Sequence, residues 1–295
     1  MLGWRLFLGP ILIVALAGLF ALDAHCGPTA PVLWGLACLL TWRSSWEMSQ
    51  LLRIRCEPNF RLCACMALAI VSANWIAPLT IAAGPELPIA GRLGPTMFVF
   101  ALAVMALFAS GLVRYSAPGK AVETLGAELL ILSYVAVFVS LTVQLRWIEG
   151  GKLGYLPLAS LVVATKCGDT AAFFTGRWFG KTKLSPLISP GKTRAGAVGA
   201  FLGAAAGSWA WINWGTGWLT HAQPGPWYWA VFYGIVLGVV GLVGDLAESL
   251  IKRDVGQKDS APLLPGFGGL LDLLDSILFT GPVAYLLWLV LPLTT

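Results

Sequence analysis

Residues 95–113 read PTMFVFALAVMALFASGLV and contain no charged side chain. A run of this length approaches the ~20 apolar residues that an α-helix needs to cross a hydrocarbon layer of ~30 Å. Similar runs recur along the 295 residues, of which 58% are hydrophobic and 11% charged, and the mean hydropathy is +0.80. A soluble core could not bury this much apolar side chain, so the sequence predicts an integral membrane protein.

The apolar runs predict an all-α, polytopic bundle of about nine transmembrane helices. Strands are disfavoured, because the runs do not alternate and a lipid-facing backbone must satisfy its own hydrogen bonds. The first run, from Leu6 to Leu22, follows a single basic residue and precedes many further spans, so we expect a retained helix rather than a cleaved signal peptide. The run at 30–42 is short and contains Pro31. The predicted spans are 3–22, 30–42, 62–83, 95–113, 127–145, 153–175, 195–215, 227–250 and 270–292.

The net charge of +5 does not indicate nucleic-acid binding, because Lys and Arg lie in short loops between apolar runs. Alternate loops differ strongly: those around residues 43–61, 177–194 and 252–258 are rich in Lys and Arg, whereas the intervening loops carry few. The positive-inside rule then predicts a multi-pass protein of the cell inner membrane, with the N-terminus inside and the C-terminus outside.

Cysteine usage gives little indication of a metal cluster. Cys63-Ala-Cys65 with Cys56 is the one suggestive group, but the pair opens an apolar run and no His is nearby. We expect these cysteines to be ordinary buried thiols.

Ionisable residues divide the chain into two regions. Before about residue 150 we expect no acidic residue deep in an apolar run, so 1–150 is predicted to be a transmembrane scaffold. An ionisable residue at membrane depth costs at least a few kcal/mol and normally marks a functional site. Region 151–295, predicted to be catalytic with a site facing the cytoplasm, carries Lys166, Asp169, Asp245, Glu248, Asp272 and Asp275.

Two carboxylate clusters flank one predicted cytoplasmic loop. Asp245 and Glu248 share a helix face with Ser249, and Asp272 and Asp275 form a second i, i+3 pair. Paired carboxylates suit Mg²⁺, which completes its shell with substrate phosphates, and nearby Lys and Arg balance the remaining phosphate charge. The other interpretation of each acid is a salt bridge or a helix-end charge reaching the interface.

A second basic constellation lies between the spans predicted at 153–175 and 195–215. It runs from Gly168-Asp169 through Arg177 and Lys181 to Ser189-Pro-Gly-Lys-Thr-Arg-Ala-Gly196. Small and basic residues before a helix start suit a phosphate-holding loop, and plain positive-inside charge explains them equally well. The spacing is not that of a P-loop.

At these residues the sequence resembles the phosphatidate cytidylyltransferases, also called CDP-diacylglycerol synthases. Their signature is close to Ser-x-x-Lys-Arg-x4-Lys-Asp, then a Pro-Gly-His-Gly-Gly turn, then Asp-Arg-x-Asp. Residues 244–249 and 189–196 resemble two further motifs of that family, and the resemblance covers about 160–285. The matching positions of the main signature are Ser249, Lys252, Arg253, Lys258, Asp259, Pro265, Gly266, Gly268, Gly269, Asp272 and Asp275.

Three positions depart from the family pattern. Phe267 stands in place of His, Leu273 in place of Arg, and Ala195 in place of the usual Glu. The loss of His removes a candidate phosphate donor or proton carrier, and the loss of Arg removes a cation beside Asp272. Phosphoryl-type transfer depends chiefly on metal and positioning, so we expect a divergent enzyme rather than an inactive one.

The resemblance implies that the phosphate of phosphatidate attacks the α-phosphorus of CTP and that pyrophosphate leaves. It implies Mg²⁺ as cofactor, with K⁺ as a candidate second cation. It also implies a protein embedded in membrane lipid, with a homodimer as the candidate assembly. The catalytic residues implied are Asp245, Asp272, Lys258 and Asp259. The implied metal ligands are Asp245, Asp272, Asp275, Glu248 and Asp169. The implied phosphate-binding residues are Ser189, Lys192, Thr193, Arg194, Lys252, Arg253, Gly268 and Gly269.

Two other classes of function remain open from the sequence. A CTP-dependent polyprenol or lipid kinase would use the same phosphate chemistry on a free alcohol. A cation-coupled transporter would use intramembrane acids for ions in transit, but the charges gather at one membrane face and the two halves show no repeat.

Overall fold

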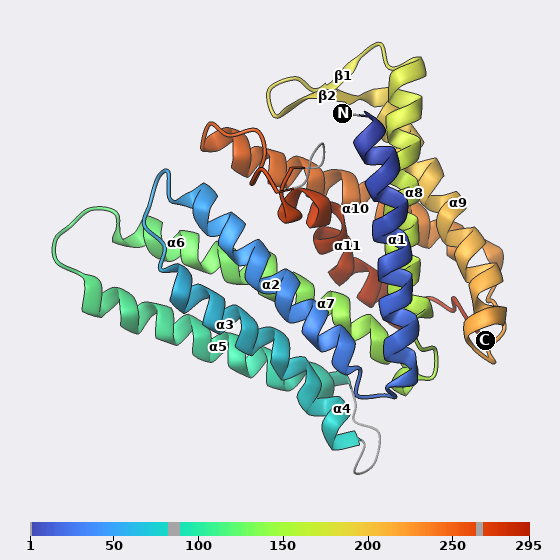
Figure 1. The fold of residues 1–295 in the computed structure, drawn as a ribbon, viewed down its shortest axis with the longest axis horizontal. Helices are drawn as coiled ribbons and strands as arrows, with labels where there is room; N and C mark the ends of the chain where they lie inside the picture. Colours follow the sequence, from blue (N-terminus) through green and yellow to red (C-terminus); the bar gives the residue numbers. More distant parts are fainter. Residues whose placement is uncertain (1, 82–88, 264–267) are drawn as a thin grey trace. The chain divides into compact units, whose positions relative to one another are not determined.

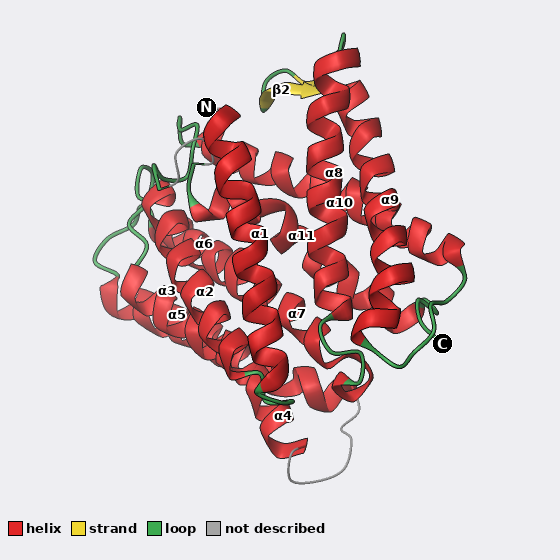
Figure 2. Cartoon of the chain, turned by 45° about the vertical axis from the view of Figure 1, so that its right-hand side comes forward, coloured by secondary structure: helices red, strands yellow, loops and turns green. Residues whose placement is uncertain are grey.

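The computed structural model describes residues 2–81, 89–263 and 268–295 (Figure 1). The predicted Pro265-Gly266-Phe267 turn lies outside these residues. The described chain is almost entirely helical, with two short strands (Figure 2). It divides into two compact units, unit 1 with Met1–Val143 and Val255–Leu273, and unit 2 with Gln144–Asp254 and Leu274–Thr295.

Helices from the N-terminal part of the chain build most of unit 1. Within it, α2, α3, α5 and α6 lie side by side in Figure 1. The helices are α1 (Leu2–His25), α2 (Pro31–Leu52), α3 (Phe60–Ser72), η1 (Ala73–Trp75), α4 (Ile76–Ile81), α5 (Ile89–Arg114), α6 (Ala121–Ile131), η2 (Leu132–Val137) and α7 (Phe138–Gln144).

Unit 2 is built on three closely packed helices and a hairpin, with most of α11 belonging to it. Its elements are η3 (Leu145–Gly151), α8 (Leu156–Phe179), β1 (Lys183–Ser185), β2 (Ser189–Thr193), α9 (Arg194–Leu219), α10 (Trp227–Asp254) and α11 (Leu270–Val290).

Where the chain is described, the nine predicted apolar runs lie mostly in helices, although those at 30–42, 153–175 and 270–292 each extend one to three residues beyond a helix end. The helix that contains the predicted span 30–42 is longer than that span, because α2 runs from Pro31 to Leu52 and includes Arg43 and Glu47. By length and composition, six helical stretches of the described residues could cross a membrane. They are Phe60–Thr80, Leu93–Arg114, Ala121–Glu149, Arg194–Leu219, Trp227–Asp254 and Leu270–Val290. The all-α membrane class is thus confirmed, and the count of nine crossings stays a prediction.

Polar side chains start several of these helices. Asp23 of α1 accepts hydrogen bonds from the backbone N–H groups of Val32 and Leu33, at 2.6 and 3.1 Å, beside Pro31 at the start of α2. Asn59 accepts from Leu62 N–H at 3.2 Å and caps α3. These acceptors satisfy amides that have no partner within the helix.

Glycine allows α9 to approach its neighbours in unit 2. A Cβ added at Gly203 would lie 2.7 Å from the carbonyl oxygen of Cys167 on α8. A Cβ added at Gly238 of α10 would lie 3.0 Å from the Cα of Phe201 on α9. Small residues at such interfaces let helix backbones pack closely in a membrane, where no hydrophobic force drives helices together.

The sequence pattern missed the strands. β1 and β2 form an antiparallel hairpin in which Lys183 pairs with Thr193 and Ser185 with Ser189. The hairpin lies between two apolar helices, α8 and α9, and its residues are mostly half-buried or exposed. Unpaired strands are excluded only where the backbone faces lipid. This segment is too short and too polar to cross the hydrocarbon layer.

The N-terminal region was expected to hold no acid deep in an apolar run, yet it holds buried acids, and Glu128 lies within the apolar helical stretch Ala121–Glu149. The side chains of Glu47 and Glu128 are fully buried. Glu128 Oε1 lies 2.9 Å from Arg114 Nη2 and accepts from Asn59 N–H at 2.9 Å. A local hydropathy window does not reveal a buried acid whose partners lie on other helices.

The prediction of buried thiols is confirmed for Cys56 and Cys63 and wrong for Cys65. Cys56 and Cys63 are buried, whereas Cys65 is exposed. Burial raises the pKa of the Cys56 thiol in the turn after α2, which keeps it protonated and unreactive. Across the described ranges, no three His, Cys, Asp or Glu side chains form a group that could hold a metal ion.

Candidate functional site

The hairpin presents the motif at 189–196 at the start of α9. Thr193 is the N-cap of α9, and its hydroxyl accepts from Gly196 N–H at 3.1 Å. A Cβ at Gly176 of α8 would lie 3.1 Å from the Thr193 hydroxyl, so α8 also packs against the cap. The small residues at 176 and 196 therefore serve helix packing and capping at this point.

An ion pair joins this motif to the acidic cluster of α10. Lys192 Nζ lies 2.6 Å from Asp245 Oδ2, and their side chains are 18% and 39% exposed. Arg253, at the end of α10, donates from Nε to the Ile188 carbonyl at 3.3 Å. Two motifs more than fifty residues apart in sequence are thus held together in unit 2.

Glu248 and Lys252 form a buried pair on α10. Glu248 Oε2 lies 2.6 Å from Lys252 Nζ, and the side chains are 1% and 11% exposed. The predicted metal-ligand role of Glu248 and phosphate-contact role of Lys252 stay predictions. In the structure each group is engaged by the other.

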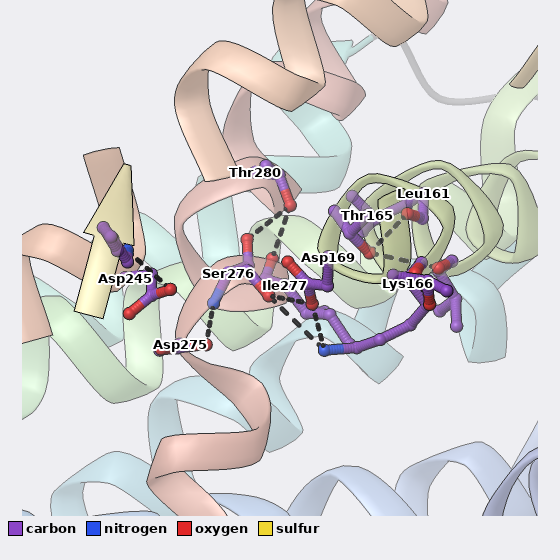
Figure 3. Close-up of polar contacts among 12 residues, drawn as sticks. Leu161, Thr165, Lys166, Asp169, Asp245, Asp275, Ser276, Ile277 and Thr280 are labelled. Atoms are coloured by element: carbon purple, nitrogen blue, oxygen red, sulfur yellow. Dashed lines mark hydrogen bonds and ion pairs between the residues drawn. The ribbon is translucent and has the colours of Figure 1, made fainter. Parts of the chain in front are cut away.

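A third polar cluster joins α8 to α11 in unit 2 (Figure 3). Lys166 Nζ lies 2.9 Å from Asp169 Oδ2 and 3.4 Å from Ser276 Oγ. The Ser276 hydroxyl donates to Asp169 Oδ2 at 3.5 Å, and Ser276 N–H donates to Asp275 Oδ1. Asp169 is 49% exposed, so one side of the cluster is open. The contacts of Ser276 with α8 are visible only in the fold.

Asp272 lies in unit 1 at the start of α11. Its Oδ2 accepts from Gly269 N–H at 2.7 Å, from Ser260 N–H at 2.9 Å and from Ser260 Oγ at 2.8 Å. Gly268 has φ +88°, and a Cβ there would lie 3.1 Å from Asp272 Cγ. Lys258 and Asp259, the other predicted catalytic residues of this loop, are exposed.

The backbone amides at the start of α11 already have an anionic partner. Leu270 and Leu271 N–H donate to the carboxylate of Glu47, at 3.0 and 2.8 Å. A phosphate bound to these amides would have to displace Glu47. The predicted phosphate contacts of Gly268 and Gly269 stay predictions, while the structure explains both glycines by close packing.

Glu47 lies next to the predicted ligand Asp272, linked to it through Ser260, and the sequence analysis did not single it out. The predicted span 30–42 stops short of Glu47. Arg43 and Glu47 are an i, i+4 pair, joined at 2.9 Å, and this spacing was the available signal.

The three residues that depart from the family pattern lie in different parts of the structure. Ala195 and Leu273 are half-buried, in the first turns of α9 and α11 respectively. Phe267 lies outside the described residues. No described contact shows a group that replaces the missing His or Arg function.

The predicted ligands fit a hard cation by their chemistry. Carboxylate oxygens suit Mg²⁺, which usually keeps several waters and takes one or two carboxylates plus substrate phosphates. A preformed group of three ligands, which the described residues lack, is therefore not required. Asp245 belongs to unit 2 and Asp272 to unit 1. Their sharing of one ion-bearing cavity, and the identity of the cations, stay predictions.

Fold and site together define a helical membrane protein with paired carboxylates and basic side chains suited to phosphate chemistry. The model of the cytidylyltransferase family matches residues 5–291, and the chain belongs to this family.

Relatives in several bacteria carry the name phosphatidate cytidylyltransferase. The chain is 41% identical to one from Synechocystis sp. over 124 residues, covering 40% of this chain and 38% of the relative. It is 39% identical to one from Brucella suis over 133 residues, covering 45% and 47%. It is 30% identical to one from Chlamydia muridarum over 250 residues, covering 83% and 79%. The matches to the Synechocystis and Brucella proteins thus span less than half of each relative.

Proposed function

We propose that this protein transfers the cytidylyl group of CTP to phosphatidate and forms CDP-diacylglycerol and pyrophosphate. The Lys192–Asp245 ion pair carries the proposal, because it brings a basic phosphate-type loop against an acidic helix within a membrane protein of the cytidylyltransferase family. The name phosphatidate cytidylyltransferase, which the relatives carry, supports phosphatidate as the acceptor and CTP as the donor.

In the proposed reaction a phosphate oxygen of phosphatidate forms a bond to the α-phosphorus of CTP. The bond from the α-phosphorus to the bridging oxygen breaks, and pyrophosphate leaves with that oxygen. Such transfers depend on alignment and on neutralising phosphate charge more than on covalent chemistry of the protein.

The chain's own residues would divide the task. Asp245 and Asp272 would hold Mg²⁺, which when bound neutralises phosphate charge. Lys192 would exchange partners, from the Asp245 carboxylate to a phosphate of CTP. The supporting acids would be Asp169, Glu248 and Asp275. The remaining phosphate contacts would come from Ser189, Thr193, Arg194, Lys252, Arg253, Lys258, Gly268 and Gly269, with Asp259 beside them.

The proposed setting is the cell inner membrane, with the N-terminus and the site on the cytoplasmic side. It is supported by the basic loops, because Lys and Arg are retained on that side. This placement suits a reaction between a lipid and a soluble nucleotide. A homodimer is the proposed assembly, and the mass of the purified protein in detergent would test it.

Purified protein in phosphatidate-containing vesicles should convert labelled CTP to labelled lipid and release one pyrophosphate per product. EDTA should abolish the reaction and Mg²⁺ should restore it. Asp245→Asn should lower kcat by about 100-fold or more, because a ligand of the Mg²⁺ that would neutralise the reacting phosphates is lost.

The control is Asp254→Asn, an acid at the exposed end of α10, which should keep near wild-type activity. A folded, vesicle-inserted protein that yields no CTP-dependent lipid product would refute the proposal. Release of CDP with a free alcohol acceptor would instead identify a lipid kinase.

A further inference from the structure

A fully buried glutamate of α2 contacts the start of α11, within unit 1. Glu47 Oε1 accepts from Leu270 N–H at 3.0 Å, and Oε2 accepts from Leu271 N–H at 2.8 Å. Oε2 also accepts from the Ser260 hydroxyl at 3.0 Å, across 213 positions of sequence. One carboxylate therefore ties α2 both to the loop before α11 and to the first turn of that helix.

The same serine contacts a proposed metal ligand. Ser260 Oγ lies 2.8 Å from Asp272 Oδ2, and Ser260 N–H donates to that oxygen at 2.9 Å. Ser260 Oγ is within hydrogen-bond distance of both carboxylates. A serine hydroxyl has one proton, so it donates to one of them at a time. The place of the Asp272 carboxylate therefore depends on where Glu47 holds Ser260.

Glu47 has several polar partners in its buried position. Arg43 Nε lies 2.9 Å from Glu47 Oε1, and the Arg43 guanidinium stacks 4.3 Å from the ring centre of Trp46. A buried carboxylate is tolerated when it is paired and hydrogen-bonded, and a helix N-terminus favours an anion. These contacts hold the carboxylate in one orientation.

The groups around Gly269 are closely packed. A Cβ at Gly269 would collide with the Ser260 hydroxyl and with the Glu47 carboxylate. Its N–H donates to Asp272 Oδ2 at 2.7 Å. Both carboxylates thus pack directly against the glycine backbone.

We infer that Glu47 is a positioning residue, which acts through Ser260 and the first turn of α11 to hold Asp272 in its cation-binding orientation. The inference rests on the proposed function. Groups that hydrogen-bond metal-binding carboxylates fix their orientation, and their loss typically costs ~10–100-fold in metal affinity or activity. Each Glu47 contact described above is to a protein group, so its effect on cation binding would be indirect.

Glu47→Gln tests the inference, because glutamine keeps the size but loses the charge and one acceptor oxygen. Glu128→Gln is the matched control: Glu128 is also fully buried, also paired with an arginine, and lies in the same unit. The first readout is Mn²⁺ binding to the purified protein by electron paramagnetic resonance, with Mn²⁺ standing in for Mg²⁺. The second is the Mg²⁺ concentration that gives half-maximal activity.

Glu47→Gln should weaken Mn²⁺ binding and raise the Mg²⁺ requirement by about tenfold or more, with the KM for phosphatidate little changed. Glu128→Gln should leave both near wild type. Hydrogen exchange of the amides of residues 268–275 should be faster in Glu47→Gln and unchanged in the control. A purely structural role for Glu47 would lower stability without shifting the Mg²⁺ requirement.

Ser260→Ala is the second variant and decides the matter if Glu47→Gln does not fold. It removes the shared hydroxyl and leaves the bonds from Glu47 to the amides. Mn²⁺ binding should again weaken, and in a folded double variant the two losses should be non-additive because both act on Asp272.

The inference is overturned if the folded variants bind Mn²⁺ as tightly as wild type, if Glu128→Gln is equally impaired, or if the wild type binds no Mn²⁺. A wild type that binds Mn²⁺ but makes no CDP-diacylglycerol refutes the proposed function alone. The Mn²⁺ comparison between variants would then still decide the role of Glu47.

Discussion

Lysine and carboxylate side chains pair in unit 2, across a long stretch of sequence in one case and within one helix in the other. Lys192 meets Asp245 between the hairpin and α10, and Lys166 meets Asp169 along α8. In the proposed site, the pair with Asp245 would hold Lys192 beside the place where the phosphate charge of CTP arrives. Such half-buried pairs contribute more through placement than through net stability.

Lys192→Met should lower kcat/KM for CTP by about 100-fold, because a preorganised cation beside the transferred phosphate is lost. Lys192→Arg should retain more activity, since it keeps the charge. Steady-state kinetics in phosphatidate vesicles measures both. Equal activity of wild type and Lys192→Met would exclude Lys192 from the site.

At the scale of elements, helix contacts in unit 2 depend on small residues. α9 packs against α8 and α10 through backbone approaches that glycine alone permits at 203 and 238. The three helices carry the hairpin and Asp245, so their spacing sets the geometry of the Lys192–Asp245 pair.

Gly203→Val should destabilise the protein by about 1–3 kcal/mol, because the added methyl groups overpack the α8–α9 contact. The neighbouring Leu202 is 65% exposed, so Leu202→Ala is the control and should change little. Thermal unfolding followed by circular dichroism in detergent measures the difference. An unchanged melting temperature for Gly203→Val would contradict the close packing of these helices.

At the scale of the whole molecule, the described helices and the loop charges together bear on membrane topology. Six helices qualify as spans by length and composition. α2 and α8 do not, and they carry Arg43 and Glu47 in one case and Lys166 and Asp169 in the other. Polar helices of this kind cross a membrane only when other helices shield them.

Nine crossings would put the two ends of the chain on opposite sides of the membrane. Reporter fusions at each terminus, active only in the cytoplasm or only outside it, should therefore show the N-terminus inside and the C-terminus outside. Both ends on one side would mean that an odd number of the predicted spans does not cross. The span 30–42 would be tested first, because it is short and contains Pro31.

The sequence alone determined the helical membrane class, the approximate helix positions and the family motifs. Hydrophobic partition is a sum over one contiguous segment, so local composition is enough to read it. The tertiary structure alone decided which charges meet: Lys192 with Asp245, Ser276 with Asp169, and Glu47 with Ser260 and the start of α11. Such contacts depend on distances between atoms on separate helices, and no local pattern encodes those distances. The hairpin likewise required the fold, because its short strands are stabilised by pairing with each other and not by their own composition.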